Sequence, residues 1–184
     1  MGIDPGKSGA LAILDGDGLP VEVNRTPLVI KPGVKRDRGP YDVAAIRDYL
    51  ERWRAAGKVV AGGLFVVLEK LDAMPPKYAP GGIANYNRGV ATGWAWMLTA
   101  LRIPFSHVLP RVWQAEMHEG VNGGDRKARS IEIARRLFPS VDLITPGKTT
   151  PSDGIAEALL MAEYGRRGGM RNRPSRGQMA MAAP

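Results

Sequence analysis

The sequence predicts an α/β domain in which helices flank a mixed β-sheet. Two apolar segments, residues 8–14 and 19–25, are joined by Asp-Gly-Asp-Gly at residues 15–18, a turn sequence that favours a β-hairpin. Residues 1–3 supply a short strand before them. Helical and strand-like segments then alternate, and a three-stranded meander followed by such alternation is typical of a mixed sheet with helices on its faces.

An unbroken apolar run marks the strand expected at the centre of this sheet. Residues 64–68 read Leu-Phe-Val-Val-Leu, and Glu69 follows them. The first and fourth strands can then pair in parallel, which would bring Asp4 and Glu69 to neighbouring strand ends. The five predicted strands span residues 1–3, 8–14, 19–25, 62–71 and 105–109.

Five helices are expected to cover the sheet. Asp42 is a fitting N-cap for the first and Ser152 for the last, and a loop rich in proline and glycine is predicted over residues 72–82. The predicted helices span residues 42–57, 85–102, 111–117, 125–138 and 152–167.

The composition indicates one soluble globular domain over residues 1–167, followed by a basic tail. Residues 168–184 contain three arginines, no acid and much glycine, methionine and alanine, which is typical of a disordered segment. The 184 residues contain no cysteine, so disulfides and thiolate metal sites are excluded. No apolar run approaches the roughly 20 residues of a membrane span, so no membrane association is expected.

The charge favours a polyanionic partner. Lysine and arginine number 26 against 18 acidic residues, a net charge of +8. Nucleic acid is the first candidate and anionic lipid the second, although a charge excess also keeps proteins soluble. The basic candidates for contacts with a nucleic-acid backbone are Lys7, Lys35, Arg36, Arg38, Arg126 and Lys127.

Four acidic residues are candidate metal ligands. Asp4 and Glu69 end two strands, and Asp153 and Glu157 lie one turn apart on the last helix. Simpler roles stay open, because Asp4 can cap its own turn, Glu69 can reach solvent and Asp153 can favour the helix dipole. Converging carboxylates would repel one another without cations, and Mg²⁺ or Mn²⁺ prefers oxygen ligands.

An all-carboxylate metal site in a basic protein is most simply that of a nuclease. Two ions about 3.5–4 Å apart would stabilise the attacking and the leaving oxygens of phosphodiester hydrolysis. The two histidines, His107 and His118, are too isolated to be expected as ligands.

Five motifs over residues 1–167, taken together and in order, resemble one family. The motifs are Gly2-Ile-Asp-Pro-Gly-Lys-Ser-Gly-Ala10, Val66-Val-Leu-Glu69, Leu109-Pro-Arg-Val-Trp113, Lys127-Ala-Arg with Ala134-Arg-Arg-Leu-Phe-Pro139, and Ser152-Asp-Gly-Ile-Ala-Glu-Ala-Leu-Leu160. They resemble those of RuvC-like Holliday junction resolvases of the phage type, within the ribonuclease H-like nucleases. The resemblance implies that fold and a five-stranded mixed sheet.

The resemblance assigns family acids to Asp4, Glu69 and Glu157. The remaining family acid falls on Gly154, and Asp153, one residue earlier, is its stand-in.

The family's aromatic wedge, three residues after the second acid, falls on Asp72. Either Tyr78 or Met74 in the following loop makes that contact with DNA, or no residue of this chain does. Because only three residues precede Asp4 in its strand, a start of the chain upstream of Met1 is expected.

The resemblance further implies a homodimeric, Mg²⁺-dependent endonuclease of DNA recombination and repair. Such an enzyme places paired nicks in branched DNA, uses no small-molecule cofactor and works in the cytoplasm of a bacterial or phage-infected cell. The predicted helix at residues 85–102, with Trp94 and Trp96, is either the dimer element or an ordinary amphipathic helix on the sheet.

Two other functions fit part of the sequence. An actin-like ATPase or sugar kinase shares the sheet topology and the aspartate beside a phosphate-holding hairpin, but it needs a second nucleotide-binding half. A non-catalytic protein that binds branched DNA would keep the fold, and the glycine at position 154 keeps that alternative open.

Overall fold

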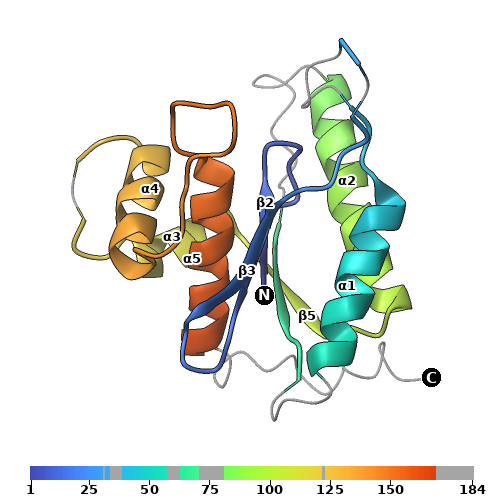
Figure 1. Cartoon of the computed structure of the whole chain (residues 1–184), viewed down its shortest axis with the longest axis horizontal. Coiled ribbons are helices and arrows are strands. Elements are labelled where there is room, and N and C mark those ends of the chain that lie inside the picture. Colours follow the sequence, from blue (N-terminus) through green and yellow to red (C-terminus); the bar gives the residue numbers. More distant parts are fainter. Residues whose placement is uncertain (31, 34–38, 58–62, 71–80, 122, 169–184) are drawn as a thin grey trace.

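The computed structural model contains one five-stranded mixed sheet (Figure 1). It describes residues 1–30, 32–33, 39–57, 63–70, 81–121 and 123–168. The strands are β1 (Gly2–Ile3), β2 (Ala10–Leu14), β3 (Pro20–Arg25), β4 (Val66–Glu69) and β5 (Phe105–Val108), in the spatial order β3-β2-β1-β4-β5. β2 pairs antiparallel with β1 and β3, whereas β4 pairs parallel with β1 and β5. The predicted mixed sheet, a three-strand antiparallel meander with two further parallel strands, is confirmed.

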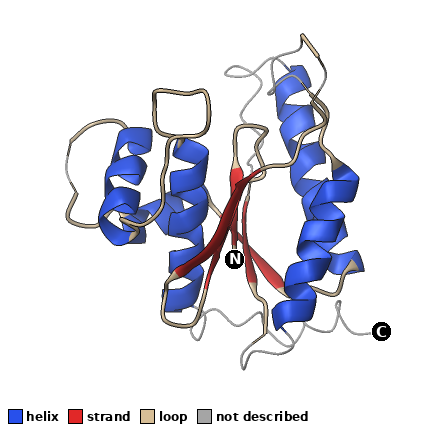
Figure 2. Cartoon of the chain, in the orientation of Figure 1, coloured by secondary structure: helices blue, strands red, loops and turns tan. Residues whose placement is uncertain are grey.

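Helices cover both faces of the sheet (Figure 2). On one face lie α1 (Val43–Gly57) and α2 (Gly81–Ala100), and on the other lie α3 (Pro110–Met117), α4 (Arg126–Leu137) and α5 (Asp153–Gly168). Successive side chains of a strand point to opposite faces, so Ala10 and Ala12 of β2 pack in the core under α5, while Leu11 and Ile13 pack under α1 and α2. The sheet therefore separates two apolar cores.

The central strand β1 lies directly against α5. A Cβ added at Gly2 would lie 2.1 Å from the carbonyl oxygen of Ala158 and 2.5 Å from the amide nitrogen of Ala162. Only glycine permits this backbone approach. The contact fixes the position of α5 over the end of β1 where Asp4 follows.

Three predicted boundaries need correction. The second helix was predicted over residues 85–102, and it spans Gly81–Ala100. Gly81 and Gly82 therefore belong to this helix and not to the loop predicted over residues 72–82. The end of the helix is set by Arg102, which has a φ of 52°, and by the amide of Ile103, which donates to the carbonyl of Leu98 at 2.9 Å. The fourth strand covers only Val66–Glu69 of the predicted residues 62–71.

Helix α5 ends at Gly168, and the rest of the predicted tail, residues 169–184, lies outside the described residues. Among the helices that are described, none is both long and apolar enough to cross a bilayer.

Candidate active site

Asp4 follows β1 and holds the turn after it. The Asp4 amide donates to the carbonyl of Ala10, and the Gly6 amide donates to Asp4 Oδ1, both at 3.0 Å. A Cβ at Gly9 would lie 2.3 Å from the Asp4 carbonyl oxygen and 2.6 Å from its carboxyl carbon. The simple role of capping its own turn is therefore real, and the same contacts fix the Asp4 carboxylate against the backbone.

Glu69 lies beside Asp4 at the end of β4. Gly2 pairs with Val67 and Ile3 with Leu68, so the next step of the parallel register brings Asp4 opposite Glu69. Glu69 is 7% exposed. Because side chains alternate along β4, Glu69 shares the face of Val67, which packs in the core under α5.

Trp113 orients Glu69. Its indole Nε1 donates to Glu69 Oε1 at 3.1 Å from a fully buried position on α3. The sequence identified Trp113 as part of a motif and assigned it no role. The only signal for that role was the motif itself, because the contact depends on how α3 packs against the sheet.

The first two turns of α5 carry Asp153 and Glu157, one turn apart. Ser152 Oγ accepts from the amide of Ile155 at 3.3 Å, which confirms the predicted cap. A Cβ at Gly154 would lie 2.3 Å from the carbonyl oxygen of Ser8 in the turn after β1. No side chain fits there, so in this chain the acid of the first turn stands at Asp153.

Gly154→Ala is expected to lower the free energy of unfolding by about 1–3 kcal/mol, because backbone atoms must move to admit the methyl group. The midpoint of thermal unfolding should fall by about 2–10 °C. Gly16→Ala is the matched control, since a Cβ at Gly16 would meet no atom within 4 Å. Equal midpoints for the two variants would contradict the close contact between α5 and the turn.

Three carboxylates of the site have raised pKa values. Burial is the main cause in each case, bringing the pKa to about 6 for Asp4, about 7 for Glu69 and about 8 for Glu157. Repulsion adds to burial: Asp153 raises the pKa of Asp4, and Asp4 raises the pKa of Glu69. All three of the other acids raise the pKa of Glu157. The four acids therefore form one coupled electrostatic group.

Lys127 supplies a cation to this group. Its ammonium forms an ion pair with Asp153, and its charge lowers the pKa of Asp4 and Glu157. The donors are carboxylate oxygens, the type that hard divalent cations bind, and Lys127 stabilises their ionised forms as a metal ion would. As the side chains stand, no group of three acids or histidines in the described ranges is spaced to hold a metal. The donor set fits a divalent ion, and binding one requires the carboxylates to turn toward it.

Two tyrosines that were not predicted as site residues, Tyr41 and Tyr86, lie near the turn that follows Asp4. Lys7 Nζ is 5.5 Å from the centroid of the exposed Tyr86 ring on α2. The Tyr41 hydroxyl donates to the carbonyl of Pro5 at 2.9 Å, and Tyr41 interacts with both Tyr86 and Asp4. Burial, followed by repulsion from these neighbours, raises the pKa of Tyr41.

The remaining predicted DNA contacts are divided. Arg126 and Lys127 open α4 and are exposed, with Lys127 next to the acids through Asp153. Four other candidates lie outside the described residues: Lys35, Arg36, Arg38 and Tyr78.

The fold of this chain is similar to that of a solved structure over almost its full length. The chain is similar to the Thermus thermophilus RuvC structure, with a TM-score of 0.48 and 15% sequence identity, over 91% of this chain and 95% of that chain. No protein-family model matches the sequence, and no curated protein matches it either. The roles of individual residues therefore rest on the geometry of this chain.

Proposed function

We propose that this protein is a metal-dependent endonuclease that cuts branched DNA, with four-way junctions as substrate. The observation that carries the proposal is the coupled group of buried and half-buried carboxylates where β1, β4 and α5 meet. An exposed basic helix start adjoins that group, and the chain has a net charge of +8. DNA is a polyanion and would be repelled by the carboxylates. Cutting it beside them requires positive charge, which the basic start of α4 supplies.

The four acids would hold two Mg²⁺ or Mn²⁺ ions: Asp4, Glu69, Asp153 and Glu157. When bound, such ions activate a water and stabilise the leaving oxygen of a phosphodiester. The turn at Gly6 fixes Asp4, and the indole of Trp113 fixes Glu69. Lys127 pairs with Asp153, and if a divalent ion compensated that carboxylate, the Lys127 ammonium would be free to bind a phosphate oxygen of the substrate.

Further DNA contacts are assigned to basic and aromatic side chains around the acids. Lys7 and Arg126 bind phosphates, and Tyr86 beside Lys7 offers an exposed ring on which an unpaired base can stack. Lys35, Arg36, Arg38 and Tyr78 lie outside the described residues, and their contacts with DNA are proposed from the sequence alone.

The proposed enzyme is a homodimer formed through α2. Trp94 is 5% exposed and packs on the sheet, whereas Trp96 is 73% exposed. A Cβ at Gly89 or at Gly93 would meet no atom within 4 Å, so both glycines border open space. An exposed tryptophan next to small residues is a surface that a second copy of the helix can cover.

Trp96→Glu is expected to convert a dimer into monomers, because it removes the largest exposed apolar side chain of α2 and adds a charge. Sedimentation velocity measures the change directly. Leu19→Glu is the matched control, since Leu19 is an exposed apolar residue on the hairpin. A Trp96→Glu protein that sediments as the wild type does would rule out this interface.

The function is tested with end-labelled four-way junctions and linear duplexes of the same sequence. With Mg²⁺ or Mn²⁺, the wild-type protein should nick the junction in opposing strands and leave the duplex intact. Junction binding without cleavage in either metal would overturn the nuclease and favour a non-catalytic DNA-binding protein. Binding of ATP by the same preparation would instead favour the actin-like alternative.

A further inference from the structure

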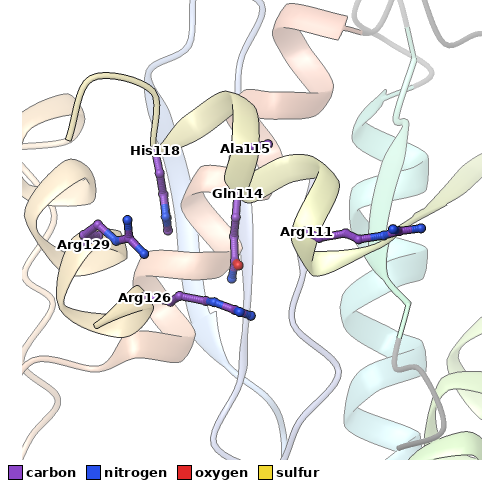
Figure 3. A pocket seen from close by; sticks show the side chains of 6 residues that line it. All are labelled: Arg111, Gln114, Ala115, His118, Arg126 and Arg129. Carbon is purple, nitrogen blue, oxygen red and sulfur yellow. The ribbon is translucent and has the colours of Figure 1, made fainter. Parts of the chain in front are cut away.

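A basic hollow lies between α3 and α4, and none of the four acids lines it (Figure 3). Its volume is about 250 Å³. The lining residues are Arg111, Gln114, Ala115, His118, Arg126 and Arg129. Three of the six are arginines and none is acidic, so the hollow is a region of positive potential.

The arginines of this hollow have no acidic partner. Elsewhere in the structure Arg47, Arg52, Arg166 and Arg167 form ion pairs with carboxylates. No ion pair within the described part of the chain involves an arginine that lines the hollow. An uncompensated group of guanidinium ions is the arrangement expected of a site whose counter-ion is a ligand.

Arg129 is the arginine of the hollow with a buried donor that lacks a partner, a state it shares with Arg25 and Arg54 elsewhere in the described residues. Its Nε atom is buried and has no hydrogen-bond partner. A buried charged donor without a partner is unfavourable, and an anion bound in the hollow would compensate the charge of the Arg129 guanidinium. Arg126 stands one turn before Arg129 on α4, so the two repel each other until an anion lies between them.

The other side chains suit a phosphate group. Figure 3 shows Gln114 and Arg126 converging at one end of the hollow, Arg129 directed toward His118 at the other, and Arg111 extending away from them. The Gln114 amide and the guanidinium groups are donors that match several phosphate oxygens at once. His118 Nε2 is 3.1 Å from Ser130 Oγ, which fixes the ring in place.

The geometry points to a second phosphate-binding site in this hollow, one that takes a backbone phosphate of the DNA strand held at the acidic site. Arg126 is adjacent in sequence to Lys127, which pairs with Asp153, so the hollow borders the acids along α4. The assignment of the phosphate to a DNA strand rests on the proposed function. The binding of a phosphate group in the hollow is independent of the proposed function.

The first test uses inorganic phosphate alone and needs neither DNA nor cleavage. The ring resonances of His118 should shift on phosphate addition at fixed pH, while those of His107 on β5, the other histidine of the chain, should not. Arg129→Gln and Arg126→Gln should each abolish the shift. Arg126 is exposed, so its variant keeps the test valid if Arg129→Gln fails to fold. An unchanged His118 resonance in the wild-type protein overturns the site.

The second test identifies the source of the phosphate. Junction affinity is measured against salt concentration for Arg126→Gln, Arg129→Gln and Arg136→Gln, the last an exposed control on α4 outside the hollow. Losing one phosphate contact should lower the slope of log K against log salt by about 0.9 in the first two variants only. A phosphate-induced shift without this change of slope overturns the assignment to DNA. A wild-type protein that never cuts DNA but passes both tests would refute the nuclease and leave the site intact.

Discussion

Asp4→Asn is expected to reduce the rate of junction cleavage by more than about 100-fold while junction binding is retained. Replacing groups that merely support metal ligands costs 10–100-fold, and Asp4 is proposed as a ligand itself. Asparagine keeps an oxygen that can accept the hydrogen bond from Gly6, so the turn should persist. Single-turnover nicking rates with Mg²⁺ and gel-shift titrations measure the two properties separately.

The control for Asp4→Asn is Asp17→Asn, which makes the same chemical change at an exposed position of the β2–β3 hairpin. It should leave both cleavage and binding unaltered. If Asp4→Asn cuts junctions at the wild-type rate, the carboxylates at the end of β1 do not form the active site. Asp4 would then be left with the turn-capping role that its contact with Gly6 already shows.

The sequence was sufficient to predict the sheet and the meeting of two acids. An apolar run without polar interruptions identified β4 as a strand covered on both faces, and the hairpin turn at residues 15–18 fixed the direction of β3 relative to β2. With β1 and β4 parallel, the adjacency of Asp4 and Glu69 follows from topology alone. The start of α2 was missed, because the glycines at 81 and 82 have low helix propensity and belong to the helix despite it.

Contacts between elements distant in sequence could not be predicted. The bond from Trp113 to Glu69 depends on how α3 packs against the sheet, and no local pattern encodes that distance. The close approach of Gly154 to the carbonyl oxygen of Ser8, which leaves no room for a side chain, was equally invisible in the sequence. The sequence shows Arg129 as one of several basic residues at the start of a helix, but its buried donor without a partner is visible only in three dimensions.

Glu157→Gln is expected to stabilise the metal-free protein at alkaline pH and to have little effect in acid. The folded-state pKa of Glu157 is about 8, above its ordinary value of 4.5, so the folded protein binds more protons than the unfolded chain between those values. Stability from this residue is therefore lost as pH rises from about 4.5 to about 8. Glutamine does not titrate, so the difference in free energy of unfolding between variant and wild type should grow across that interval.

Urea unfolding at several pH values between 4.5 and 8.5 measures this difference. The lowered pKa values of His107, His118 and the Met1 amino group act in the opposite direction, but they are common to both proteins and cancel in the comparison. Glu132→Gln is the control, since it makes the same chemical change at an exposed position of α4. A pH-independent difference for Glu157→Gln would mean that Glu157 is solvated rather than held among the other acids.

Adding Mg²⁺ should reverse the effect of pH in the wild-type protein. An ion that binds only the folded state stabilises it by an amount that rises with its concentration relative to Kd, and ionised carboxylates are its ligands. Mg²⁺ should therefore raise the stability of the wild type more at pH 8.5 than at pH 5, and raise that of Glu157→Gln less. Equal stabilisation of the two proteins at pH 8.5 would exclude Glu157 from the metal site while leaving its raised pKa explained by burial and by its acidic neighbours.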